Sequence, residues 1–239
     1  MDAFLELCIL RDLQLVTAFN EVNSDKAGYV PRTGCTYLNS QFARLLMQSD
    51  LSVEQFISDN LVADLIQNQS FQRSYRIIIP LLWRTGDSEE WLLIIVESSA
   101  QTVHFLFAKF SGVIESQISD DAKAALSVSI QEKLEAVLTS QQQQLVVANT
   151  NENNQPTITW TFVNHFNSTS EDVLTESQKR IPLAHNRGVP AKSDSGIYIM
   201  HSIECDYFDV PIFAHLDVDW QNIRHNLAYC VINEQLMIS

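Results

Sequence analysis

The stretch YRIIIPLLWRTGDSEEWLLIIVESSAQTVHFLFAKF, residues 75–110, determines the sheet of this protein. It contains three runs of aliphatic and aromatic residues, separated by the polar segments TGDSEE and ESSAQ. Runs of this length, bounded by turn-forming residues, are typical of buried strands. The short connections favour a meander of antiparallel neighbours. The three predicted strands are Tyr75–Leu82, Trp91–Val96 and Thr102–Phe110.

Apolar residues at helical spacing lie on both sides of this region. Asn39 or Ser40 is expected to cap a helix ending at Met47, and Ser52 with Gln55 forms a capping box before another helix. Gln141–Gln144 is expected to be a solvated helix end or loop, and Asn164–Lys192 a polar surface excursion. Further helices are predicted over residues 4–19, 56–66, 120–138 and 220–232, the last capped by Asp219, and another is predicted to begin after Ser195. Two further strands are predicted, Leu145–Ala148 and Thr157–Val163. These elements predict one α+β domain over residues 1–239.

Composition restricts the possible partners. The 239 residues include 29 acidic and 15 basic side chains, giving a formal net charge of −14. Binding of nucleic acid needs clustered Lys and Arg, which are absent, so a protein with a basic surface is the more plausible partner. The apolar runs are too short to cross a bilayer. The first residues lack the basic lead of a secretory signal, so an intracellular location is expected, in the nucleus or the cytoplasm.

The cysteines and histidines give no sign of a metal site. The four cysteines have no CxxC spacing, so buried free thiols are expected rather than disulfides. His201 and Cys205 stand four residues apart and could supply two zinc ligands, but two more are missing. Glu204 and Asp206 are expected to be ordinary solvated charges. Glycine-rich phosphate motifs are absent, and no cofactor is predicted.

Five short segments, taken in order, resemble the SUMO-processing and related ubiquitin-like-protein cysteine proteases. They are YLNSQFARLLM (Tyr37–Met47), RIIIPLLW (Arg76–Trp83), Glu90 with Trp91, HFLFAKF (His104–Phe110) and SDSGIYIM (Ser193–Met200). The resemblance implies a papain-like α+β fold with a central mixed sheet and flanking helices. It also implies a cleft beside Trp91 that admits the C-terminal tail of a ubiquitin-like protein.

The resemblance places different residues at the catalytic positions of those proteases. Glu90 stands at the position of the histidine, Phe107 at that of the aspartate, Ser195 at that of the cysteine and Val189 at that of the oxyanion-stabilising glutamine. Asp194 and Gly196, on either side of Ser195, agree with the family. Trp91, Asp194 and Gly196 are therefore the binding residues that the resemblance implies.

These replacements remove what a cysteine protease needs. An imidazole turns a thiol into a thiolate, whereas the Ser195 hydroxyl needs a base during attack. The carboxylate of Glu90 is a poor base for an alcohol, and Val189 has no side-chain donor for an oxyanion. We therefore expect a pseudoprotease that acts as a scaffold or adaptor subunit in a complex and binds a ubiquitin-like protein or another member.

Two alternatives remain at this point. The first is an active peptidase or isopeptidase with a rewired centre, in which Ser195 or Cys205 works with His104. A histidine within a strand is more often packed against the core. The second is an engineered Cys→Ser variant, which would explain Ser195 but not Glu90, Phe107 or Val189.

Overall fold

A five-stranded mixed sheet forms the centre of the protein, with strand order β1-β2-β3-β4-β5. The computed structural model describes residues 1–26, 34–68, 70–85, 88–107, 120–148, 159–164, 195–207 and 220–233. Its strands are β1 (Thr36–Tyr37), β2 (Arg76–Thr85), β3 (Ser88–Glu97), β4 (Thr102–Phe107) and β5 (Thr161–Asn164). Strands β2, β3 and β4 form the predicted antiparallel meander. Strands β1 and β5 pair in parallel with its two outer strands, which makes the sheet mixed.

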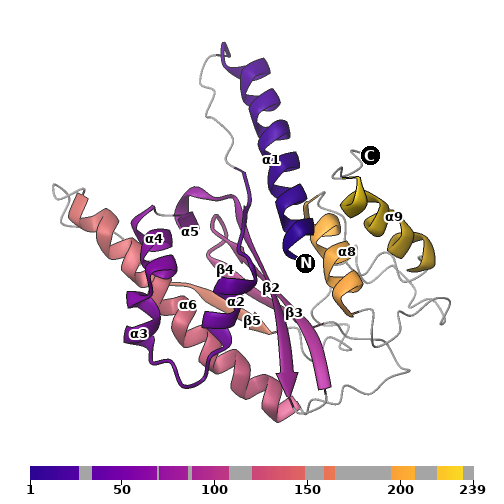
Figure 1. The fold of residues 1–239 in the computed structure, drawn as a ribbon. Coiled ribbons are helices and arrows are strands. Elements are labelled where there is room, and N and C mark those ends of the chain that lie inside the picture. Colours follow the sequence, from indigo (N-terminus) through magenta and orange to yellow (C-terminus); the bar gives the residue numbers. More distant parts are fainter. Residues whose placement is uncertain are drawn as a thin grey trace, which may run out of the picture.

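Helices cover both faces of this sheet (Figure 1). One face carries α2 (Ser40–Met47), α3 (Val53–Ser58), α4 (Asn60–Gln67), α5 (Ser70–Arg73) and the long α6 (Asp120–Ala148). The opposite face carries α1 (Asp2–Asn23), α8 (Ser195–Tyr207) and α9 (Trp220–Ile232). The expected α+β class, a mixed sheet with flanking helices, is confirmed.

The two layers explain why β3 reads as an unbroken apolar run. Leu92 and Ile94 are buried in the core on the α6 side of the sheet. Leu93 and Ile95, the alternate residues, are buried in the core on the α8 side. A strand with both faces covered has no solvent side, so its hydrophobic pattern is continuous. Among the described residues, no helix combines the length and apolar character needed to cross a membrane.

The predicted helix caps are present. The Asn39 side chain accepts hydrogen bonds from the backbone N–H groups of Gln41 and Phe42, at 3.2 Å each. Ser52 and Gln55 form the reciprocal capping box. The single helix predicted for 56–66 is wrong, because Asp59 takes extended backbone angles, ends α3 and caps α4. Its carboxylate accepts from the N–H of Leu61 at 2.9 Å, which stabilises the break.

Two predictions at the end of α6 are also wrong. The expected strand Leu145–Ala148 belongs to α6, which has 29 residues, because extending an existing helix costs less than starting a new element. Gln141 is fully buried rather than solvated, and its amide donates to the Leu65 carbonyl at 2.8 Å. The strand predicted for Thr157–Val163 is observed only in its second half, as β5 from Thr161 to Asn164, because Thr159 and Trp160 are not in a strand and residues 157–158 lie outside the described residues. The surface excursion predicted for Asn164–Lys192 begins one residue later, because Asn164 is the last residue of β5. Its remaining residues and the cap at Asp219 lie outside the described residues.

Candidate functional site

The N-terminus of α8 lies directly against β3. Helix α8 begins at Ser195, and the second residue, Gly196, approaches the indole of Trp91. A Cβ atom on Gly196 would lie 3.0 Å from the Trp91 Nε1 and 3.5 Å from its Cδ1. This contact is tighter than side chains ordinarily make, so glycine allows the helix to sit this close to the sheet. The structure therefore brings together Trp91 and Gly196, two of the three residues expected to form the binding site.

Glu90 belongs to the other face of the sheet. Its side chain is buried, and its Oε1 lies 3.7 Å from the Nζ of Lys123, a buried residue of α6. Successive residues of a strand point to opposite faces. Trp91, the next residue, packs in the α8-side core. The carboxylate expected to replace the catalytic histidine is thus directed away from α8.

The remaining expected catalytic positions are only partly described. Phe107 is the last residue of β4 and pairs with Leu92 of β3, two residues beyond Glu90. Ser195 is the first residue of α8. Val189 and Asp194 lie outside the described residues.

His104 is held at the far end of the meander. It pairs in register with Ile95, four residues along β3 from Trp91, a separation of about 13 Å along the strand. Its Nε2 lies 3.6 Å from the Glu97 Oε2, and its side chain is 27% exposed. The nearby imidazole of His104 lowers the pKa of Glu97, an effect that outweighs burial and is reinforced by the charge of Arg76. His104 thus packs against the sheet beside a carboxylate, as expected of a structural strand histidine.

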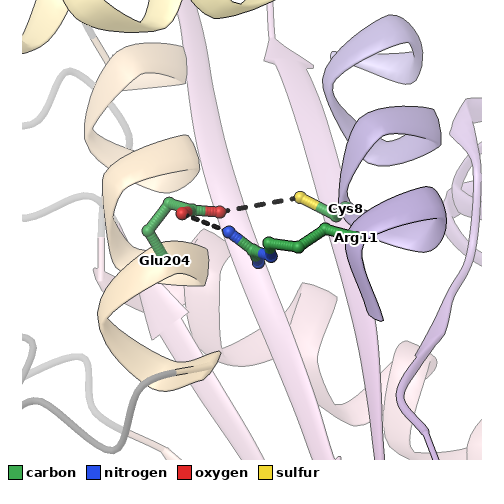
Figure 2. Close-up of polar contacts among 3 residues, drawn as sticks. All are labelled: Cys8, Arg11 and Glu204. Carbon is green, nitrogen blue, oxygen red and sulfur yellow. Dashed lines mark hydrogen bonds and ion pairs between the residues drawn. The ribbon is translucent and has the colours of Figure 1, made fainter. Parts of the chain in front are cut away.

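A buried ion pair joins α1 to α8 and contradicts one prediction (Figure 2). The Arg11 guanidinium is 3% exposed and donates to the Glu204 Oε2 at 2.5 Å. The Cys8 thiol lies 3.8 Å from the other oxygen, Oε1. Glu204, at 20% exposed, is therefore not the solvated charge that was expected. Arg11 follows Phe4 and Cys8 at helical spacing, and this was the available signal that it belongs to the buried face of α1.

The electrostatics of this cluster follow from burial and from one carboxylate. Burial raises the pKa of the Cys8 thiol, and the negative charge of Glu204 raises it further. Burial alone would lower the pKa of Arg11, but the hydrogen bond and charge of Glu204 outweigh it and the pKa is raised. At neutral pH the Cys8 thiol is therefore protonated and unreactive, and Arg11 keeps its positive charge.

The described cysteines agree with the expected free thiols. Cys8 and Cys230 are buried and unbridged, and Cys35 is a half-buried free thiol. Cys205 lies in α8, in the same helix as His201. Within the described part of the chain, no group of three or more His, Cys, Asp or Glu residues could hold a metal ion.

Fold and site together define an α+β protein in which a helix N-terminus meets a tryptophan on a mixed sheet. No protein-family model matches the chain, and no curated protein matches it. Solved structures similar to this chain include the SUMO protease Ulp1 with its catalytic cysteine oxidized to a sulfenic acid. The two sequences are 14% identical, the TM-score is 0.43, and the match covers 84% of this chain and 69% of the Ulp1 chain. Another is the C-terminal Ulp1 protease domain in complex with Smt3, the yeast ortholog of SUMO, at 16% identity and a TM-score of 0.41, over 84% and 68% of the two chains.

Proposed function

We propose that residues 1–239 form a single non-catalytic domain of the SUMO-protease type, which acts as a protein-interaction scaffold or adaptor subunit inside the cell. The observation that carries this proposal is the division of Glu90 and Trp91 between the two faces of the sheet. The indole lies at the start of α8, whereas the carboxylate pairs with Lys123 in the opposite layer. A base on the far side of a sheet cannot take a proton from a residue at the start of α8.

The chemistry of the substituted residues points the same way. The hydroxyl of Ser195 would need a base within hydrogen-bond reach, and no orienting carboxylate can come from Phe107. Val189 has no side-chain donor for a developing oxyanion. The loss of one such donor typically costs a rate factor of about 10²–10³.

A rewired centre built on His104 receives little support from the geometry. His104 is engaged with Glu97, about 13 Å along the sheet from the strand position of Trp91. Gly196, the neighbour of Ser195 in the chain, contacts Trp91, so the start of α8 lies at the other end of this stretch of β3 from His104. For Cys205, ten residues past the start of α8, the sequence favours a packing role over an exposed thiol.

A binding role at the retained part of the site is consistent with these contacts. Trp91 and Gly196 form a close contact where the resemblance places the tail of a ubiquitin-like protein, and Asp194 belongs to the same set of residues. Because Ulp1 has been solved with Smt3, SUMO is the first ubiquitin-like protein to test. We place the protein in the nucleus or the cytoplasm, without a nucleic acid, membrane or cofactor as partner.

The catalytic part of the proposal is tested by restoring the missing groups. The wild type, Ser195→Cys, and Ser195→Cys with Glu90→His are assayed with a fluorogenic C-terminal SUMO amide and a thiol-reactive SUMO tail probe. We expect no turnover by any of them, because residue 90 lies on the α6 side of the sheet. An active SUMO protease serves as the positive control. Turnover by the wild type that disappears in Ser195→Ala would contradict the proposal.

The binding part is tested by titrating SUMO into the wild type, Trp91→Ala and Trp83→Ala. Trp83 is the matched control, because it is a half-buried tryptophan of the same sheet that packs in the α6-side core. Loss of a central aromatic contact typically costs tenfold or more in affinity. We expect that loss for Trp91→Ala only. Equal affinities of the two variants would remove Trp91 from the binding site.

A further inference from the structure

Helix α1 is apolar on two opposite sides. Its inner side, with Phe4 and Cys8, is fully buried in the α8-side core. Its outer face, which we define as Ile9, Leu10 and Leu13, is 44%, 54% and 62% exposed. Each helical residue turns about 100°, so Leu10 and Leu13 lie about 200° and 140° around the axis from Cys8. Exposed apolar residues that gather on one face of a helix and are bordered by polar residues typically mark an interaction site.

The position of α1 leaves this face accessible to another protein. The helix stands at the edge of the molecule, and its second half extends beyond the sheet and beyond α8 (Figure 1). The outer-face residues follow one another at i, i+1 and i+4 and form one contiguous patch on the helix surface. Helices that dock in this way contribute side chains at the same three- and four-residue spacing.

The charges around the patch select the kind of partner. Glu6 is exposed one turn before Leu10. The one cation in this part of the helix, Arg11, is buried against Glu204 and contributes no positive charge to the outer face. With a net charge of −14 on each chain, two copies repel each other, whereas a basic partner is attracted.

We propose that the outer face of α1 docks an amphipathic helix of a partner protein, with an apolar stripe bordered by Lys or Arg. This inference goes beyond the proposed function, since it uses no residue at the N-terminus of α8. The two proposals can therefore fail separately. Loss of SUMO binding leaves the α1 surface untouched, and loss of α1 docking leaves the Trp91 site untouched.

The test places the photo-cross-linker benzoylphenylalanine at Leu13 in the full chain, which is irradiated alone and in an extract of the cells that express it. The matched control carries the cross-linker at Val22, which is 78% exposed on the same helix but about half a turn away from Leu13. Mass spectrometry then identifies the cross-linked segment. We expect position 13, and not position 22, to label a helix with Lys or Arg beside its apolar stripe. Leu10→Ser should lower the yield about tenfold, since burial of one leucine is worth about that factor.

Every other outcome overturns the proposal. A cross-link from position 13 to a second copy would make the face a homodimer contact. A cross-link within the isolated chain would show that the protein covers the face itself. Labelling of an acidic segment, equal labelling from positions 13 and 22, or no adduct in the extract would each remove the basic amphipathic helix as the occupant.

Discussion

Removal of the Glu204 carboxylate should destabilise the fold far more than removal of a surface carboxylate. In Glu204→Ala, the guanidinium of Arg11 loses the partner that lies 2.5 Å away, while its own side chain remains 3% exposed. A buried ion that loses its ion-pair partner carries a desolvation cost that this partner had offset. Because Arg11 belongs to α1 and Glu204 to α8, the contact between the two helices is weakened directly.

The size of the effect follows from burial. Breaking a buried pair by removing one partner typically costs about 3–5 kcal/mol. Glu204 is 20% exposed, so some water already reaches the pair and the lower end, about 3 kcal/mol, is expected. The pair Arg84–Glu89 has a similar separation, 2.8 Å, but its side chains are 68% and 56% exposed. Glu89→Ala should therefore cost only about 0–1 kcal/mol.

Equilibrium unfolding in urea measures both variants. With a slope of about 2–3 kcal/mol per molar urea, Glu204→Ala should lower the midpoint by about 1 M or more, and Glu89→Ala by a few tenths at most. The double variant Arg11→Met with Glu204→Leu should recover most of the loss, because it removes both charges and keeps the volume. If Glu204→Ala unfolds at the same urea concentration as Glu89→Ala, the ion pair does not hold α8 against α1 and the reasoning is refuted.

Three further predictions concern other parts of the fold. Gly34→Ala should cost about 1–3 kcal/mol, measured by thermal unfolding, because the new Cβ would clash with the carboxylate oxygen of Asp12 that accepts a hydrogen bond from the Cys35 N–H. Unchanged stability would contradict this prediction. Lys133→Met should lower the free energy of unfolding, measured in urea, by about 2 kcal/mol, because the buried ammonium donates hydrogen bonds to two carbonyls at the end of α2. Unchanged stability would mean that the cost of burying the charge cancels those hydrogen bonds. The pKa of Glu97 is lowered by His104, so the carboxylate stabilises the fold above the unfolded-state pKa of about 4.3, and this stabilisation is lost as the pH falls below that value. Glu97→Gln should reduce the loss of stability at acid pH, measured as urea unfolding curves at a series of pH values. Identical pH dependence of the wild type and the variant would refute the role given to Glu97.

Local signals predicted the elements of this protein well. The meander, the Asn39 cap and the Ser52–Gln55 capping box act between residues at most a few positions apart, and all three are present. The errors arose where a distant partner overrode a local preference. Gln141 was expected to be in solvent, but its side chain is buried and donates a hydrogen bond to the carbonyl of Leu65, 76 residues earlier in the chain.

The sequence was sufficient to locate the candidate site, but not to predict on which face of the sheet each of its residues lies. The order of short segments identified Trp91 and the start of α8 as one region, and the contact between Trp91 and Gly196 agrees with that. The sequence did not indicate that Glu90, one residue earlier, faces the opposite layer. Strand alternation separates neighbours onto two faces, but it does not say which face meets which helix.

The amino-acid sequence alone was sufficient for the three strands of the meander and most helix starts, because hydrophobic period and capping are properties of adjacent residues. The tertiary structure alone assigned Glu90 to Lys123 in α6 and Arg11 to Glu204 in α8, the second pair lying 193 residues apart along the chain. Such pairs depend on how two helical layers close over one sheet. A charged side chain that becomes buried pairs with the opposite charge that the tertiary packing places beside it.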